Sequence, residues 1–270
     1  MEEGSVPPLG PIYSLSALEL QTLRKFIEGN IKIGSIQSSQ SLGGALVPFV
    51  KKKNGNLRLC VNYWGLNKLT CKDHYPIPLI TDLLDAPKKA RIYTKINLRN
   101  AYHLVHIAKG DKWKTTFRTH YGSFKWLVMP LGLANAPAAF QRFMNEVFGD
   151  LLDIFVVVYL NDILIYLDNL EDHRGYVKEV LRHLQLHKLF ASLAKCVFHK
   201  KSVEFLGFVL GPQRLLMNKQ KVQTIRDWLM PRWLKEVQSF LEFSNFYCWF
   251  ICNYSDLVVP LTCLTKKNTP

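Results

Sequence analysis

The stretch that decides the fold is IFVVVYLNDILIYL, residues 154–167. It contains two apolar runs rich in β-branched residues, interrupted only by Asn161 and Asp162. This pattern predicts two antiparallel strands joined by a two-residue type I′ turn, because Asn and Asp tolerate the positive φ that such a turn requires. Since the runs are apolar at nearly every position, we expect both faces of the sheet to be covered.

The pair Asn161-Asp162 has two interpretations: a structural turn with no further role, or part of a site. A carboxylate at the tip of a buried hairpin is costly unless a cation or a hydrogen-bond donor meets it. The second interpretation therefore points to a metal ion at the edge of a packed sheet. The local sequence leaves both interpretations open.

The composition limits the class of protein. The chain has 270 residues, 48% of them hydrophobic, which is enough for one large domain or a domain with subdivisions. Its 35 Lys and Arg residues outnumber 21 Asp and Glu residues. The resulting net charge of +14 favours a polyanionic partner, with nucleic acid as the first candidate and an anionic membrane as the second. The six cysteines form no C-x-x-C pair, so we expect free thiols rather than a zinc site.

The apolar runs are shorter than the ~18 to 20 residues that span a bilayer. The N-terminal stretch MEEGSVPPLGPIYSLS is acidic and then Pro-rich, unlike a signal peptide. We therefore expect an intracellular protein, cytoplasmic or nuclear, that is neither secreted nor bound to a membrane.

Hairpins dominate the predicted strands. One is predicted around Asn54-Gly55, a second around Tyr121-Gly122, and a third within VEFLGFVLGP at 203–212. Helices are predicted between them; the first begins with a capping box of Ser16 and Glu19 and has Gly29 as a plausible C-cap. Because β-α-β alternation is poor, the sequence predicts an α+β fold.

The hairpin around Asn54-Gly55 is basic. Lys51, Lys52 and Lys53 precede its turn, and Arg58 follows it. It is either a solvated hairpin tip or a surface that grips phosphates, and the sequence leaves this choice open.

Several long motifs together resemble one family. FVVVYLNDILIY resembles the Tyr-x-Asp-Asp hairpin of reverse transcriptases, specifically those of gypsy-type (Metaviridae) LTR retrotransposons. FVKKKNGNLRLCVNYWGLNKLT, YPIPLITDLLD, KTTFRTHYGSFKWLVMPLGLANAPAAFQRFMN, VEFLGFVL and VQSFLEFSNFYCWFICNYSDLVVPLTCLTKK are similar to the same family in the same order. The resemblance runs from about residue 12 to residue 267.

The resemblance implies a right-hand polymerase fold, with fingers, palm and thumb and an antiparallel palm sheet backed by helices. The fingers with an N-terminal extension would be 1–72 and 105–135, the palm 73–104 and 136–212, and the thumb 213–270. No RNase H domain is expected within this sequence.

The resemblance also implies a chemistry, RNA-directed DNA synthesis on an RNA/DNA template-primer with dNTPs. Such enzymes use two Mg²⁺ (or Mn²⁺) ions, which prefer carboxylate oxygens as ligands. The family holds them with three aspartates, and the matching positions here are Asn97, Asn161 and Asp162. Because two of three carboxylates are amides, we expect weakened metal binding and impaired catalysis.

Other family positions are retained. By resemblance, Lys52 and Arg58 would hold the incoming triphosphate, and Tyr102 would screen against a ribose 2′-hydroxyl. Each also has a structural explanation, as a core aromatic or a surface residue. The positions that the resemblance assigns to template and primer are Tyr159, Gln141, Phe205, Leu206 and Gly207.

Glu242 stands where the family keeps a glycine for close packing, so we expect it to destabilise the thumb. Three descriptions of the chain remain at this point. It is a crippled polymerase, a non-catalytic nucleic-acid-binding remnant or silent subunit, or a decayed reading frame. Association with an RNase H domain or with an active copy in trans fits the first two.

Overall fold

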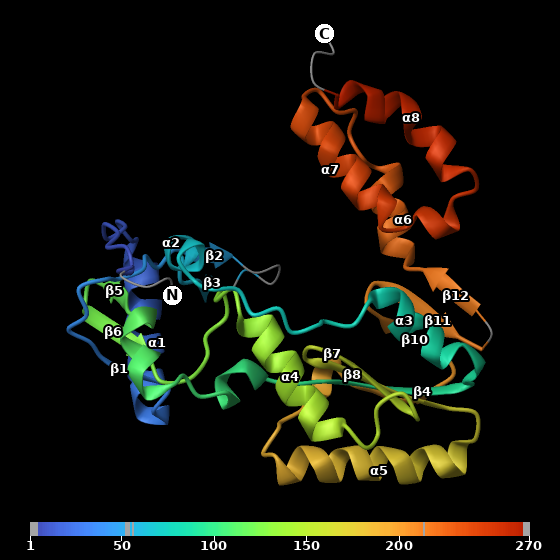
Figure 1. Cartoon of the computed structure of the whole chain (residues 1–270), viewed down its shortest axis with the longest axis horizontal. Helices are drawn as coiled ribbons and strands as arrows, with labels where there is room; N and C mark the ends of the chain where they lie inside the picture. Colours follow the sequence, from blue (N-terminus) through green and yellow to red (C-terminus); the bar gives the residue numbers. More distant parts are fainter. Residues whose placement is uncertain (1–4, 52–54, 56, 213, 267–270) are drawn as a thin grey trace.

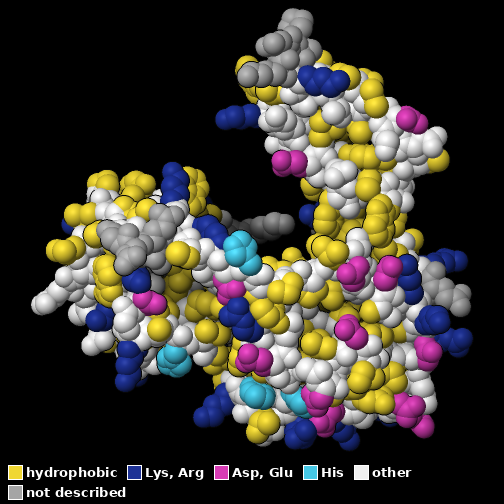
Figure 2. All heavy atoms as spheres, in the orientation of Figure 1, with side chains coloured by type: hydrophobic (Ala, Val, Ile, Leu, Met, Phe, Trp, Pro, Cys, Tyr) yellow, Lys and Arg dark blue, Asp and Glu magenta, His cyan; other side chains and the backbone are white. Residues whose placement is uncertain are grey.

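The computed structural model describes residues 5–51, 55, 57–212 and 214–266. Figure 1 shows three bodies. An N-terminal body contains α1, α2 and strands β1–β3, β5 and β6; a central body contains β4, β7 and β8, with α4 beside them and α5 below them; and a C-terminal body contains α6–α8. The surface is hollowed between the N-terminal and C-terminal bodies (Figure 2), and the central body forms the floor of this hollow.

Helices and strands alternate irregularly along the chain. Short 3₁₀ helices supplement them at 86–89, 101–104, 109–115, 193–195 and 248–250. In chain order the elements are α1 (Ala17–Ile33), β1 (Ile36–Ser38), β2 (Phe49–Lys51), β3 (Leu57–Leu59), α2 (Trp64–Lys68), α3 (Ile80–Asp85), β4 (Ile92–Asn97), β5 (Phe117–Thr119), β6 (Gly122–Trp126), α4 (Ala136–Phe148), β7 (Val156–Tyr159), β8 (Asp162–Leu167), α5 (Leu170–Leu186), β9 (Val197–Lys200), β10 (Val203–Phe205), β11 (Phe208–Gly211), β12 (Arg214–Met217), α6 (Lys219–Arg226), α7 (Leu234–Asn245) and α8 (Tyr254–Leu264).

The central sheet has the antiparallel order β7-β8-β4-β9. Successive residues of a strand point to opposite faces. Ile163 and Ile165 belong to the core that contains α4 and α5, whereas Leu164 and Tyr166 belong to the core that contains α3, β10 and β11. Both faces are therefore covered, as the uninterrupted apolar runs predict.

The turn of the β7–β8 hairpin lies one residue earlier than the sequence predicts. Tyr159 pairs with Asp162, so the turn residues are Leu160 and Asn161, and Asp162 is the first residue of β8. Leu160 has a φ of 51°, and Asn161 is not among the residues with positive φ. The predicted type I′ turn, which needs positive φ at both positions, is therefore wrong.

The N-terminal body joins two segments that are distant in sequence. Leu23 and Tyr63 share one buried core with Phe117 and Trp126. The capping box that begins α1 is confirmed, but the helix continues past Gly29 and ends at Gly34, whose φ is 79°. The hairpin β2–β3 is confirmed as well, while Asn54 at its turn lies outside the described residues.

The strands β10, β11 and β12 form a second antiparallel sheet. It crosses the predicted boundary between 212 and 213, because β12 pairs with β11. The helices α6–α8 follow this sheet. Glu242 is exposed on α7, so the expected close packing at this position is wrong and the side chain carries no packing penalty. Among the described residues, no helix is both long and apolar enough to cross a bilayer.

A buried histidine connects α5 to the sheet. His173 is fully buried, and its Nε2 atom lies 2.8 Å from the hydroxyl of Thr94. That hydroxyl also accepts a hydrogen bond from the His199 N–H at 3.0 Å. Burial, and to a lesser extent the neighbouring His199, lowers the pKa of His173 from 6.5 to about 4. The folded protein therefore keeps this imidazole neutral near pH 7.

The stability of the protein should consequently fall in mild acid. Because the pKa of His173 is lower in the folded than in the unfolded chain, its contribution is complete above pH 6.5 and is lost as the pH falls towards 4. The loss reaches about 3 kcal/mol. Denaturant titrations between pH 7 and pH 4 measure it, and His173→Gln should flatten the profile, whereas His74→Gln, at an exposed position, should not. If the two variants had the same dependence of unfolding free energy on pH, the acid sensitivity could not be assigned to His173.

Candidate active site

The register of β4 and β8 places Asn97 directly opposite Asp162. Asn97 Nδ2 donates a hydrogen bond to Asp162 Oδ1 at 2.7 Å, and both side chains are half-buried. Asp162 precedes Ile163, so it shares a sheet face with Leu164, opposite to the face covered by α4 and α5. The pair thus lies at the end of the sheet, on the face directed away from α5.

The backbone brings Asn161 to the same place. Its carbonyl accepts a hydrogen bond from the N–H of Leu98 at 2.8 Å. On the other side, the Asn97 carbonyl accepts from Ser192 N at 2.8 Å, and the Asn97 N–H donates to Cys196 Sγ at 3.4 Å. The three predicted metal-ligand positions therefore converge.

The side chains at these positions do not fit a two-metal centre. Asp162 provides the one carboxylate of the three positions, and its Oδ1 atom already accepts a hydrogen bond from an amide. In the described part of the chain, no group of three or more His, Cys, Asp or Glu residues is placed to hold a metal ion. An amide oxygen can coordinate Mg²⁺, but it brings no charge to balance a dication.

Gln141 is placed differently from its predicted role at the template. Its side chain is fully buried on α4, where Oε1 accepts from Leu160 N at 2.8 Å and Nε2 donates to the carbonyl of Val158 at 3.1 Å. The prediction of direct template contact is therefore corrected: this side chain has no exposed group, and it supports the turn that carries Asn161 and Asp162.

The two predicted tyrosines lie near this turn. Tyr159 is half-buried and pairs with Asp162 across the hairpin. Tyr102 packs on Phe140 of α4, with ring centroids 4.7 Å apart. Burial, and to a smaller extent Tyr159, raises the pKa of Tyr102, so its hydroxyl stays protonated at neutral pH. Tyr159 is thus a neighbour of the Asn97–Asp162 pair, whereas Tyr102 packs against the core that contains α4 and α5.

The other predicted residues are distributed between core, turn and surface. Phe205 is only 1% exposed and belongs to the core between the two sheets, so its side chain cannot contact a primer. Leu206 and Gly207 form the β10–β11 turn, with φ values of 51° and 87°. Arg58 is exposed on β3, and Lys52 lies outside the described residues.

The sequence did not identify Cys196 as a neighbour of Asn97, nor Gln141 as the support of the turn. The Cys196 contact spans 99 positions along the chain, and no local pattern indicates it. For Gln141 a signal existed, since Asn145 lies one helical turn further along and the two polar residues interrupt the apolar side of α4.

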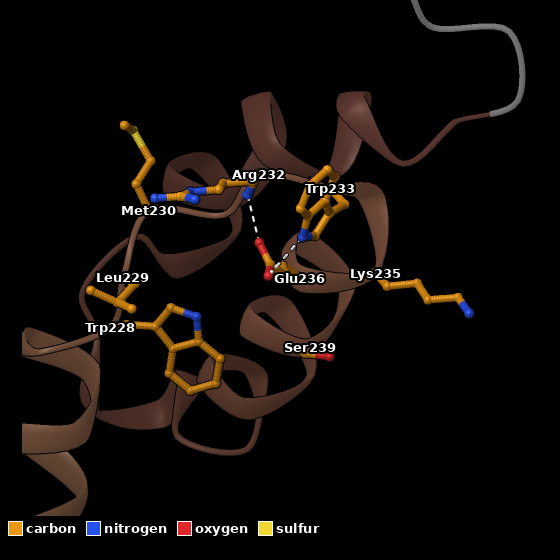
Figure 3. Close-up of a pocket in the computed structure, with 8 residues that line it drawn as sticks. All are labelled: Trp228, Leu229, Met230, Arg232, Trp233, Lys235, Glu236 and Ser239. Carbon is orange, nitrogen blue, oxygen red and sulfur yellow. Dashed lines mark hydrogen bonds between the residues drawn. The ribbon is translucent and has the colours of Figure 1, made fainter.

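A pocket of about 710 Å³ lies away from these residues, in the C-terminal body (Figure 3). The carboxylate of Glu236 in its wall accepts hydrogen bonds from Arg232 N at 2.6 Å and Trp233 Nε1 at 3.0 Å. This acid is already engaged and does not provide a reactive centre. The pocket is lined by Trp228, Leu229, Met230, Arg232, Trp233, Lys235, Glu236 and Ser239.

The comparisons with known proteins agree with this arrangement. The family model described as reverse transcriptase (RNA-dependent DNA polymerase) matches residues 50–210. The Transposon Tf2-3 polyprotein of Schizosaccharomyces pombe is 37% identical over 256 residues, which are 95% of this chain and 19% of that polyprotein. The chain therefore spans about a fifth of the length of this relative.

Two solved structures of foamy viral protease-reverse transcriptase are similar in fold. The dRH form in complex with double-stranded DNA has a TM-score of 0.88 and 24% identity, covering 96% of this chain and 46% of that one. The protein in complex with an RNA/DNA hybrid has a TM-score of 0.85 and 23% identity, covering 97% and 35%. At these identities the similarity establishes the fold alone.

Together, the antiparallel central sheet, its tight hairpin and the two flanking bodies define a right-hand polymerase, which confirms the expected α+β fold. The chain belongs to the reverse transcriptase family and corresponds to the reverse transcriptase domain of an LTR retrotransposon. The gypsy-type resemblance is consistent with the similarity to Tf2 polyproteins. Enzymes of this family use Mg²⁺ or Mn²⁺.

Proposed function

We propose that this chain binds template-primer duplexes of RNA and DNA but transfers nucleotides at a strongly reduced rate, or not at all. The observation that carries the proposal is the hydrogen bond from Asn97 Nδ2 to Asp162 Oδ1. Two carboxylates in these places would repel each other unless a cation lay between them. An amide and a carboxylate instead satisfy each other without any cation.

Duplex binding is supported by charge and fold. The chain carries a net charge of +14, and Lys51 and Arg58 are exposed on the hairpin β2–β3 of the N-terminal body. Figure 1 shows this hairpin on the side of the N-terminal body that faces the hollow. The two foamy viral structures are complexes with double-stranded DNA and with an RNA/DNA hybrid. By analogy, dNTPs and template-primer are the ligands we propose here.

Binding should depend steeply on salt. If six or more phosphates are neutralised, affinity for a template-primer falls by about a thousandfold or more between 50 and 200 mM salt. Fluorescence anisotropy with a labelled duplex measures this dependence. The double variant Lys51→Gln/Arg58→Gln should lower the slope of log K against log salt by about 1.8.

The matched control is Arg182→Gln, since Arg182 lies on α5 and pairs with Glu179 at 2.6 Å. It should leave the slope unchanged. A chain that binds no duplex at low salt would support the decayed reading frame instead. Association with an RNase H domain or with an active copy stays a prediction. The intracellular location stays a prediction as well.

A further inference from the structure

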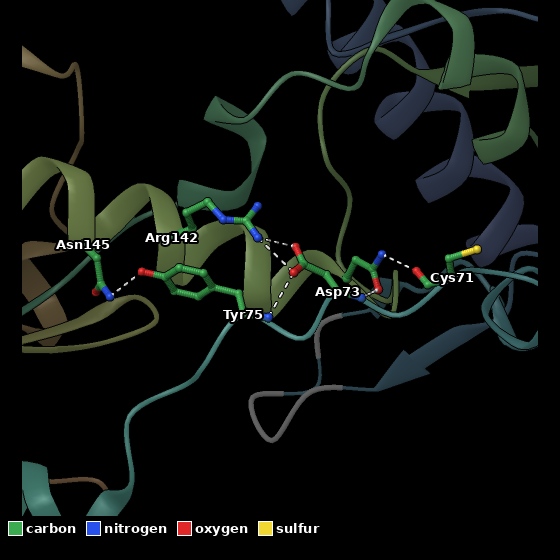
Figure 4. A network of polar contacts seen from close by, with 6 residues as sticks. Cys71, Asp73, Tyr75, Arg142 and Asn145 are labelled. Atoms are coloured by element: carbon green, nitrogen blue, oxygen red, sulfur yellow. Dashed lines mark hydrogen bonds and ion pairs between the residues drawn. The ribbon is translucent and has the colours of Figure 1, made fainter.

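A connected series of hydrogen bonds extends from the β7–β8 turn to residues 71–75. Gln141 accepts a hydrogen bond from Leu160 N at 2.8 Å, and its Nε2 donates to Asn145 Oδ1 at 2.9 Å. Asn145 Nδ2 in turn donates to the hydroxyl of Tyr75 at 2.7 Å. The first contact joins the β7–β8 turn to helix α4, the second lies within α4, and the third joins α4 to residues 71–75. Figure 4 shows the last of these hydrogen bonds, between Asn145 and Tyr75.

Residues 71–75, which we call the strap, run from the N-terminal body towards α3 (Figure 1). The strap is held on α4 by further contacts. Both carboxylate oxygens of Asp73 lie 2.9 Å from Arg142 Nη2, and the Arg142 guanidinium lies over the Tyr75 ring at 4.8 Å (Figure 4). Asn135 Nδ2 donates to the Cys71 carbonyl at 2.9 Å. The strap is therefore a fixed support rather than a loose connection.

The donor and the acceptor of each hydrogen bond in this series follow from the chemistry of its atoms. Leu160 N can only donate, so the atom of Gln141 facing it must be the oxygen, and Nε2 must face the Val158 carbonyl and Asn145. Asn145 must then present its oxygen to Gln141 and its amino group to Tyr75. Connected networks of this kind restrain each member more than isolated pairs do.

We propose that Tyr75 and Asn145 are positioning residues for the turn that carries Asn161 and Asp162. They restrain the Gln141 amide and, through it, the Leu160 N–H. The turn's geometry therefore depends on where the strap lies, and the strap follows the N-terminal body. The inference concerns the site of the proposed function, but its test measures structure, so it stands or fails independently of polymerase activity.

Hydrogen exchange of the Leu160 amide, measured by NMR on leucine-labelled full-length protein, tests the proposal. Gln141→Leu removes the acceptor and should accelerate exchange by about tenfold. Tyr75→Phe should accelerate it by about threefold in the unaltered chain, and by no further factor in the Gln141→Leu chain. Asn145→Asp keeps an acceptor for Gln141 Nε2, and its carboxylate can accept a hydrogen bond from the Tyr75 hydroxyl in place of donating to it, so exchange should stay within about twofold of the unaltered chain.

Two controls separate local from global effects. Tyr121→Phe deletes a hydroxyl that bonds Leu20 O at 3.3 Å, far from the turn, and should leave Leu160 exchange unchanged. The Leu164 amide reports opening of the whole sheet. The proposal is overturned if Tyr75→Phe leaves Leu160 exchange unchanged, accelerates Leu160 and Leu164 equally, or acts by the same factor in the presence and absence of Gln141. If Gln141→Leu fails to fold, comparing Tyr75→Phe with Asn145→Asp still decides.

Discussion

Replacing Asn97 and Asn161 by aspartate should raise the rate of primer extension by about three orders of magnitude or more. A unit charge about 4 Å from a cation contributes about 4 kcal/mol at an effective dielectric constant of ~20. About 1.4 kcal/mol of barrier corresponds to a tenfold change in rate, so one restored carboxylate accounts for that factor. The two restorations need not add, because residues of one site act as a unit.

Primer extension on RNA and DNA templates with Mg²⁺ or Mn²⁺ measures this effect. The matched control is Asn245→Asp/Asn253→Asp, which makes the same change of net charge at exposed positions of the C-terminal body. It should leave the rate of the unaltered chain as it is. Extension by the unaltered chain at nearly the rate of the Asn97→Asp/Asn161→Asp variant would show that the amides are no obstacle.

The second large effect concerns stability. In the unaltered chain the Asn97–Asp162 hydrogen bond satisfies the site without metal, so Mg²⁺ should shift the melting temperature by less than about 1 °C. In the Asn97→Asp/Asn161→Asp variant, carboxylates face each other where an amide now donates. We expect this variant to melt below the unaltered chain without metal, because like charges at close range repel.

Added metal should reverse this difference. At about one hundred times the dissociation constant, a ligand of the folded state contributes about 2.7 kcal/mol, which corresponds to about 5 °C for a protein of this size. Thermal melts with and without Mg²⁺, in Ca²⁺-free buffer, measure the shift of the melting temperature. The Asn245→Asp/Asn253→Asp variant is the control. An equal rise for the unaltered chain would mean that its site still gathers divalent ions.

The features that could be predicted from the sequence are those set by neighbouring residues. The capping box of Ser16 and Glu19 and the hairpin predicted around Tyr121-Gly122 depend on a few adjacent side chains, and both form. The turn residues of this hairpin are His120 and Tyr121, one position earlier than predicted, because Thr119 pairs with Gly122. The buried β7–β8 strands follow from their continuous apolar pattern, which requires cover on both faces.

The features that were missed depend on contacts between distant parts of the chain. The β7–β8 turn consists of Leu160 and Asn161 rather than of Asn161 and Asp162. A buried amide of α4, that of Gln141, accepts a hydrogen bond from the Leu160 N–H. Phe205 belongs to a buried core that also contains Tyr93 and Tyr247, which are distant from it in sequence. At Glu242 a family pattern predicted close packing, but this face of α7 is exposed.

The most direct measurement is a titration of the unaltered chain with Mn²⁺, followed by electron paramagnetic resonance, beside the Asn97→Asp/Asn161→Asp variant. The loss of about 4 kcal/mol per carboxylate predicts an affinity at least about a thousandfold weaker in the unaltered chain, with both proteins equally folded. Mn²⁺ binding of similar affinity in the two proteins would contradict the account.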